Sequence, residues 1–178
     1  MNANAISIRE DQLKLGLWMF LATVTMLFAA FTSAYIVRRS GSDWQHVALP
    51  SILWINSAVL VASSIAVEFA QTQSARGRWR AATAAMVIAC ALGVAFLGGQ
   101  VAAWRQMTAA GVYLPTSPHS SFFFMLTGAH AVHVVAALVV LAWGACEVKR
   151  PLKLSLCRTF WHYLGGVWLF LFALVTLL

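Results

Sequence analysis

Two histidines, His130 and His133, lie near the middle of an apolar stretch that covers residues 121–143. Imidazole nitrogens bind haem iron, copper and zinc. In lipid a polar ring is tolerated where it faces protein or a polar partner, so an intramembrane histidine marks a candidate functional site. The i, i+3 spacing puts both rings on one helix face. We therefore expect them to share a partner that the rest of the chain supplies.

A third histidine, His162, follows Trp161 near the start of the last apolar stretch. Haem ligation by two histidines needs rings from facing helices at matching depth, and a small metal needs three or four converging ligands. His162 lies about one turn inside the membrane, whereas His130 lies near its middle. We expect no metal, haem or catalytic site, and we expect His130 and His133 to hydrogen-bond to neighbouring helices.

Glu68 is the one acidic residue within any apolar stretch of the sequence. A single acid offers no carboxylate pair or chain for a proton relay. Glu68 lies a few residues before a basic turn that contains Arg76, Arg78 and Arg80. We expect its side chain to reach the membrane interface and pair with Arg76 or Arg78.

The composition shows what must position these residues. Of 178 residues, 61% are hydrophobic and 10% are charged, and the mean hydropathy is +0.80. A spanning helix needs about 20 mainly apolar residues, and five stretches qualify: about 13–37, 49–70, 81–104, 120–146 and 159–178. Residues 1–12 are expected to form a short polar tail with no secondary structure of its own. The sequence predicts one all-α domain, an integral membrane bundle of five transmembrane helices.

The basic residues divide unequally between the two sides that five alternating spans define. One side holds nine: Arg9, Lys14, Arg76, Arg78, Arg80, Lys149, Arg150, Lys153 and Arg158. The other holds three: Arg38, Arg39 and Arg105. By the positive-inside rule the N-terminus is cytoplasmic and the C-terminus lies on the outer side. The net charge of +7 then reflects topology and anionic lipid, and no nucleic acid partner is expected.

Several motifs together resemble subunit III of the haem-copper terminal oxidases. They are LGLWMFL at 15–21, Ile55-Asn56, the segment 100–104, TGAHAVHV at 127–134 and WHYLGGVWLFLF at 161–172. The resemblance covers nearly the whole chain, with all five spans in family order, and it matches the short five-helix bacterial form. The residues that carry it, with structural roles, are Gln100, Trp104, Gly128, His130, His133, Trp161, His162 and Trp168.

The resemblance implies a non-catalytic accessory subunit of a cytochrome c oxidase of the aa3 type, in the bacterial cytoplasmic (inner) membrane. It implies that haem and copper sit in partner subunits I and II. It also implies that this subunit packs against subunit I, binds phospholipid and supports proton uptake. The alternatives are subunit III of a quinol oxidase or of a nitric oxide reductase system, and an independent small transporter or haem-binding membrane protein.

Three acids that are common in the family are absent here. Val24 replaces one in the first span, Ala103 replaces one before Trp104, and Gly165 replaces one after the Trp-His pair. The lipid role is therefore expected to matter more than proton handling. We expect lipid in a cleft between spans one–two and spans three–five. The candidate ligands for its phosphate are Arg76, Arg78 and Arg80.

Overall fold

Five α-helices build the structure, a computed structural model that describes residues 3–44, 48–114 and 116–177. They are α1 (Ala3–Arg39), α2 (Ile52–Ala75), α3 (Trp79–Ala109), α4 (Pro118–Cys146) and α5 (Pro151–Leu177). Each contains a stretch long and apolar enough to cross a membrane. The part of the chain described contains no strand. The all-α class with five spanning helices is therefore confirmed.

The helices extend beyond the predicted apolar stretches, because polar residues continue them past the hydrocarbon. α1 begins at Ala3, so the prediction of an unstructured polar tail is wrong from there onward, while residues 1–2 lie outside the described part. Leu178, the last residue of the fifth predicted span, also lies outside it. α2 and α3 end where glycine allows a left-handed backbone, with φ of 71° at Gly77 and 79° at Gly111.

The start of α4 is fixed by its own side chains. The Ser117 hydroxyl accepts a hydrogen bond from the Ser120 backbone N–H, and the Ser120 hydroxyl accepts one from the Ser117 backbone N–H. Pro118 follows in the first turn, where its missing N–H needs no partner. This capping box orients the helix that carries His130 and His133.

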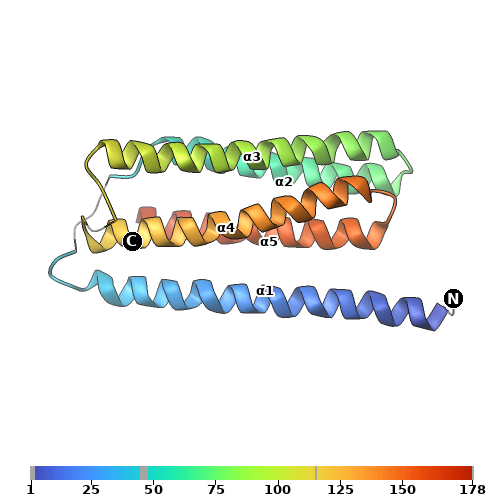
Figure 1. Ribbon diagram of the computed structural model, residues 1–178, viewed down its shortest axis with the longest axis horizontal. Coiled ribbons are helices and arrows are strands. Elements are labelled where there is room, and N and C mark those ends of the chain that lie inside the picture. The colour runs from blue at the N-terminus through green and yellow to red at the C-terminus, as the bar shows by residue number, and fades with distance from the viewer. Residues whose placement is uncertain (1–2, 45–47, 115, 178) are drawn as a thin grey trace.

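Four helices form a bundle, and α1 lies along one side of it (Figure 1). α2 packs on α3 and α5, and α4 packs on both of these helices. Within the described residues α1 contacts only α4 and α5. The expected cleft, with spans one and two on the same side, is therefore wrong, because α2 belongs to the bundle and α1 alone stands apart from it.

Small residues explain why α2 stays with α3. Ser63 lies fully buried at their interface and donates to the Ala89 carbonyl across 3.0 Å. Further along, Gly99 lies so close to Asn56 that an added Cβ would come within 2.2 Å of the Asn56 Oδ1 atom. Small residues let helix backbones approach closely in lipid, where packing drives association.

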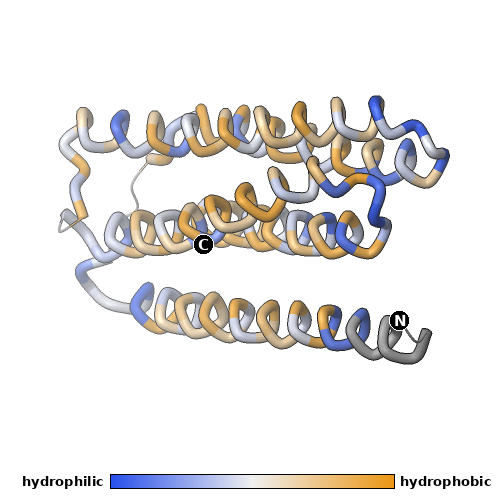
Figure 2. The backbone as a smooth tube through the Cα atoms, turned by 45° about the vertical axis from the view of Figure 1, so that its right-hand side comes forward, coloured by the Kyte–Doolittle hydropathy of each residue, from blue (hydrophilic) through white to orange (hydrophobic). Residues whose placement is uncertain are grey.

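Basic residues occupy the two connections at one end of the bundle, namely Arg76, Arg78, Lys149 and Arg150. The connections 76–78 and 147–150 lie at the end where α1 begins, and the C-terminus lies at the opposite end (Figure 1). Apolar residues dominate the middle of the helices and hydrophilic residues gather at their ends (Figure 2). Outward side chains such as Met26, Val37 and Val132 are about 70% exposed, as expected of helices surrounded by lipid.

Candidate functional site

His130 lies in the core of the bundle, with only 1% of its surface exposed. Its ring centroid is 5.4 Å from Trp168 of α5, 6.1 Å from Phe96 of α3 and 6.3 Å from Phe28 of α1. Neither ring nitrogen has a hydrogen-bond partner among the described residues. The expected bond to a neighbouring helix is therefore wrong for His130, because aromatic rings surround it instead. His130 packs as an aromatic side chain.

His133 lies one turn further along α4 and is only partly buried. Its Nδ1–H donates to the Ala129 carbonyl of its own helix across 2.8 Å, so the expected bond to another helix is wrong here also. Its ring lies 5.6 Å from Phe28, which is also a neighbour of His130. The two histidines thus share an aromatic neighbour from α1 and no polar one.

Two tryptophans of the predicted motifs join helices through their indole N–H groups. Trp168 of α5 donates to the Ser57 hydroxyl of α2 across 2.9 Å. Trp104 of α3 donates to the Thr127 hydroxyl of α4 across 3.0 Å. The first bond joins α5 to α2, and the second joins α3 to α4. Sequence reasoning did not single out Ser57 or Thr127 as acceptors.

The remaining motif residues are placed by packing. Trp161 is 2% exposed, and its ring lies so close to Gly93 of α3 that an added Cβ there would come within 2.7 Å of it. Gln100 is 1% exposed, and its amide has no hydrogen-bond partner within the described part. Gly128 is partly exposed, and an added Cβ there would meet nothing within 4 Å.

Glu68 of α2 forms a polar cluster with two side chains of α5, between two helices that are long and apolar enough to cross a membrane. Its Oε1 atom accepts from Arg158 Nε and from His162 Nε2, each at 2.6 Å. The expected partners, Arg76 and Arg78, are therefore wrong. The side chain of Glu68 faces α5, whereas Arg76 lies eight residues further on, about 12 Å along the helix axis.

Arg158 was missed by sequence reasoning, although a signal was present. Arg158 and His162 have the i, i+4 spacing that puts them on one face of α5. That face also carries Gly165, against which the Ser64 hydroxyl of α2 lies. A basic pair at this spacing in one span and a lone acid in another indicate an interhelical ion pair.

A double-mutant cycle on this cluster is expected to give a coupling free energy of about 1 kcal/mol between Glu68 and Arg158. Glu68→Leu and Arg158→Leu should each destabilise the chain, because each removes one side of the ion pair that joins α2 to α5. The double variant should recover most of that loss. The measurement is the free energy of unfolding in a titration with sodium dodecyl sulfate.

The matched control for the cycle is Arg76→Leu, which removes a cation with no ion pair in the described part of the chain. Its coupling to Glu68→Leu should be near zero. A coupling larger for Arg76 than for Arg158 would contradict the observed pairing.

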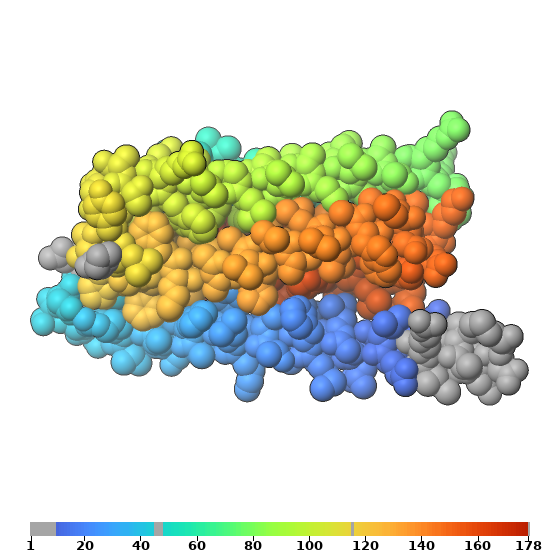
Figure 3. Space-filling view, viewed as in Figure 1, coloured from blue at the N-terminus to red at the C-terminus, as the bar shows by residue number. Residues whose placement is uncertain are grey.

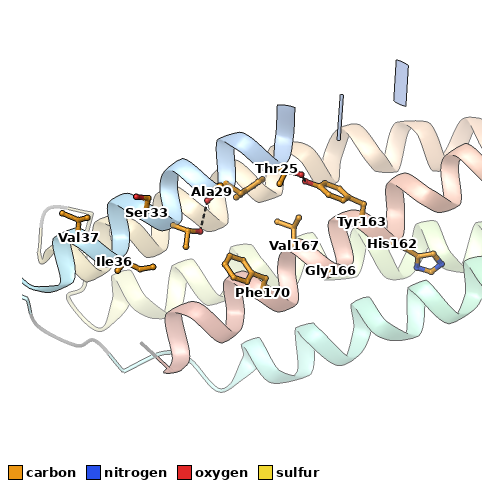
Figure 4. Close-up of a pocket in the computed structure, with 12 residues that line it drawn as sticks. Thr25, Ala29, Ser33, Ile36, Val37, His162, Tyr163, Gly166, Val167 and Phe170 are labelled. Carbon is orange, nitrogen blue, oxygen red and sulfur yellow. Dashed lines mark hydrogen bonds between the residues drawn. The ribbon is translucent and has the colours of Figure 1, made fainter. Parts of the chain in front are cut away.

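A groove runs between α1 and α2 along the outward face of α5. One part, about 760 Å³, lies between α1 and α5 (Figure 4). A second part, about 420 Å³, lies between α2 and α5 beside Glu68. His162 and Gly166 line both parts. The wall that α1 forms is apolar apart from a few hydroxyl groups. One of these, the Thr25 hydroxyl, is hydrogen-bonded to the Tyr163 hydroxyl of α5 across 2.7 Å.

The three predicted phosphate ligands lie away from this groove. Arg76 and Arg78 are exposed in the connection between α2 and α3, and Arg80 is exposed in the first turn of α3. None of them lines either part of the groove. Arg80 lines a different hollow, between α3 and α4.

The three positions without family acids are buried, and one of them, Gly165, also lines the part of the groove between α2 and α5. Val24 is 3% exposed on the face of α1 that meets the bundle, and Ala103 is fully buried. Gly165 is buried beside Ser64 of α2. No group of three or more metal-binding side chains occurs among the described residues.

The fold and the site define a multi-pass helical membrane protein, a four-helix bundle with one flanking helix and a cluster of Glu68, Arg158 and His162 between two of its spanning helices. The family model described as cytochrome c oxidase subunit III matches residues 3–177. The chain belongs to that family.

Three relatives show the breadth of the family. A probable quinol oxidase subunit 3 of Staphylococcus saprophyticus is 27% identical over 98% of this chain and 94% of its own length. A cytochrome c oxidase subunit 3 of Thermostichus vulcanus is 25% identical over 92% of this chain and 86% of its own length. A cytochrome bo(3) ubiquinol oxidase subunit 3 of Pseudomonas putida is 26% identical over 92% of this chain and 84% of its own length.

Proposed function

We propose that this chain is the non-catalytic accessory subunit III of an aerobic haem-copper terminal oxidase. The observation that carries the proposal is the family match over nearly the whole chain. Haem and copper belong to partner subunits I and II, and subunit I packs directly against this chain. The single domain spans the bacterial inner membrane, with the basic end, where α1 begins, in the cytoplasm.

The electron donor in this proposal is cytochrome c, which makes the complex a cytochrome c oxidase. The alternative is a quinol oxidase, because relatives of similar identity carry that name. No residue of the described site distinguishes cytochrome c from quinol as the donor. The side chains of Glu68, Arg158 and His162 bond to one another and not to a donor. The donor must therefore be identified in the assembled complex.

The groove between α1 and α2 is proposed to hold the acyl chains of phospholipid. Its walls are mainly apolar, and the larger part is lined by side chains of α1 and α5 (Figure 4). Lipid there would fix α1, which meets only α4 and α5 within the described part. Through this support the subunit would stabilise subunit I and its proton uptake.

The test is isolation of the tagged chain from its native membrane in mild detergent. A reduced-minus-oxidised spectrum and the identities of co-purifying proteins are recorded. Haem a absorbance, with a large multi-helix partner and a copper-bearing one, is the expected result. Haem b or o would favour the quinol alternative. A chain that purifies alone and colourless would overturn the accessory-subunit proposal.

A further inference from the structure

A second hollow lies at the basic end of the bundle, on the side away from α1. It has a volume of about 850 Å³ and lies between the first turns of α3 and the end of α4. The walls include the small residues Thr83, Ala84 and Ala145, whose side chains leave the space between the helices open. The start of α3 and the end of α4 meet at the end of the molecule where α1 begins (Figure 3).

Cations dominate the rim of this hollow. Arg80, Lys149 and Arg150 line it together with one acid, Glu147. Glu147 Oε2 accepts from Arg150 Nε and Glu147 Oε1 accepts from Lys153 Nζ, each at 2.9 Å. The Lys153 ammonium holds the pKa of the Glu147 carboxyl below its ordinary value. The ionised carboxylate is therefore already paired with Arg150 and Lys153.

Two cations of the rim are left without an acid. No ion pair in the described part of the chain involves Arg80 or Lys149. Both side chains belong to exposed residues. Their charges are therefore available to an anion that enters the hollow.

Aromatic side chains place this rim at the membrane surface. Trp79 lines the hollow and is 38% exposed. The Lys153 ammonium lies 4.4 Å above the ring of Trp143, which is 49% exposed. Tryptophans are typical of the boundary between headgroups and hydrocarbon.

An apolar surface continues from the hollow toward the middle of the membrane. On α3, Ala84 is followed at helical spacing by the exposed Val87 and Ile88. On α4, the exposed Val139 lies one turn before Trp143. A ligand that fits both regions carries a negative charge at the surface and an apolar chain below it.

We propose that this hollow binds the headgroup of an anionic phospholipid, with the phosphate between Arg80 and Lys149 and an acyl chain along the outward faces of α3 and α4. The site is separate from the groove between α1 and α2. It depends on the membrane position of the basic end and not on the oxidase assignment. An acidic peptide would satisfy the cations but would leave the apolar surface below them without a matching ligand.

The test measures phosphatidylglycerol bound to the full-length chain by native mass spectrometry, with phosphatidylcholine of the same acyl chains as the neutral comparison. In the double variant R80Q/K149Q the affinity for phosphatidylglycerol should fall roughly 30-fold, the contribution of two basic residues near an anionic surface. Phosphatidylcholine binding should hardly change. Thermal unfolding followed by circular dichroism checks that the variants fold.

The matched control is R76Q/R78Q, which removes two charges from the adjacent turn outside the hollow. It should weaken phosphatidylglycerol binding by less than about threefold, because screening limits the reach of an exposed charge. An equal loss in both double variants would mean general surface attraction and would overturn the site. No loss in R80Q/K149Q would overturn it as well.

Two further experiments test the position of the lipid in the hollow and whether the bound phosphate belongs to a lipid. Ala84→Trp fills the hollow with all charges kept, and it should weaken phosphatidylglycerol binding about tenfold. Unchanged binding would overturn the proposed position. Inorganic phosphate at millimolar concentration should not displace the lipid, and displacement would reassign the site to a soluble anion.

Discussion

Replacing Gly93 with leucine is expected to lower the free energy of unfolding of the purified chain by about 3 kcal/mol. Gly93 lies where α3, α4 and α5 meet. An added Cβ would come within 2.6 Å of Leu138 Cδ2 on α4 and 2.7 Å of Trp161 Cη2 on α5. Trp161 is a large, rigid side chain and is only 2% exposed. A larger side chain must therefore push the helices apart.

The control is Gly98→Leu on the same helix, where an added Cβ would meet nothing within 4 Å. Both variants gain the same helix propensity, about 1 kcal/mol relative to glycine, so their difference reports packing alone. Gly98→Leu should leave the free energy of unfolding unchanged or slightly raised. The measurement is a titration with sodium dodecyl sulfate followed by tryptophan fluorescence. Equal effects of the two substitutions would contradict the close approach at Gly93.

The sequence predicts the helices well because length and hydropathy decide them. The five spanning helices follow from apolar stretches of about 20 residues, and no tertiary information is needed for that step. The residues at which the helices begin and end are harder to predict. α2 continues from the predicted end at residue 70 to Ala75, because main-chain hydrogen bonds and Gly77, rather than hydropathy, decide where it stops.

Which helices pack together was not accessible from the same patterns. In lipid nearly every side chain of a span is apolar, so an apolar face does not show whether it meets a helix or lipid. α1 illustrates this limit. Leu21, Val24 and Phe28 face the bundle, while Met19 and Met26 are exposed. The predicted grouping of α1 with α2 failed for this reason.

The partners of polar side chains depended on that packing. Glu68 was expected to bind the arginines nearest in sequence, but α5 brings Arg158 and His162 within 2.6 Å of its carboxylate. The indole of Trp168 likewise reaches Ser57 of α2. The positions of such residues on a helix are visible in the sequence, whereas the helix opposite them is known only from the fold.

Replacing His130 with alanine is expected to lower the free energy of unfolding by about 3 kcal/mol, whereas His130→Phe should stay within about 1 kcal/mol of the natural chain. Alanine leaves a cavity between Phe28, Phe96 and Trp168, whose rings surround His130. Phenylalanine fills that space. It also removes two buried nitrogens that have no partner among the described residues, and a buried polar group without a partner is destabilising.

His133→Phe is the control, because His133 shares the neighbour Phe28 but is only partly buried and has its Nδ1–H bonded to Ala129. Its effect should be small and should come from the loss of one hydrogen bond, about 1 kcal/mol. The discriminating comparison is His130→Phe against His130→Ala. If phenylalanine destabilises the chain as much as alanine does, the nitrogens of His130 have a polar partner in the membrane, and its role is not aromatic packing. If phenylalanine restores stability, the motif histidine at mid-membrane acts through the shape of its ring, which is consistent with a subunit that supports an oxidase by packing.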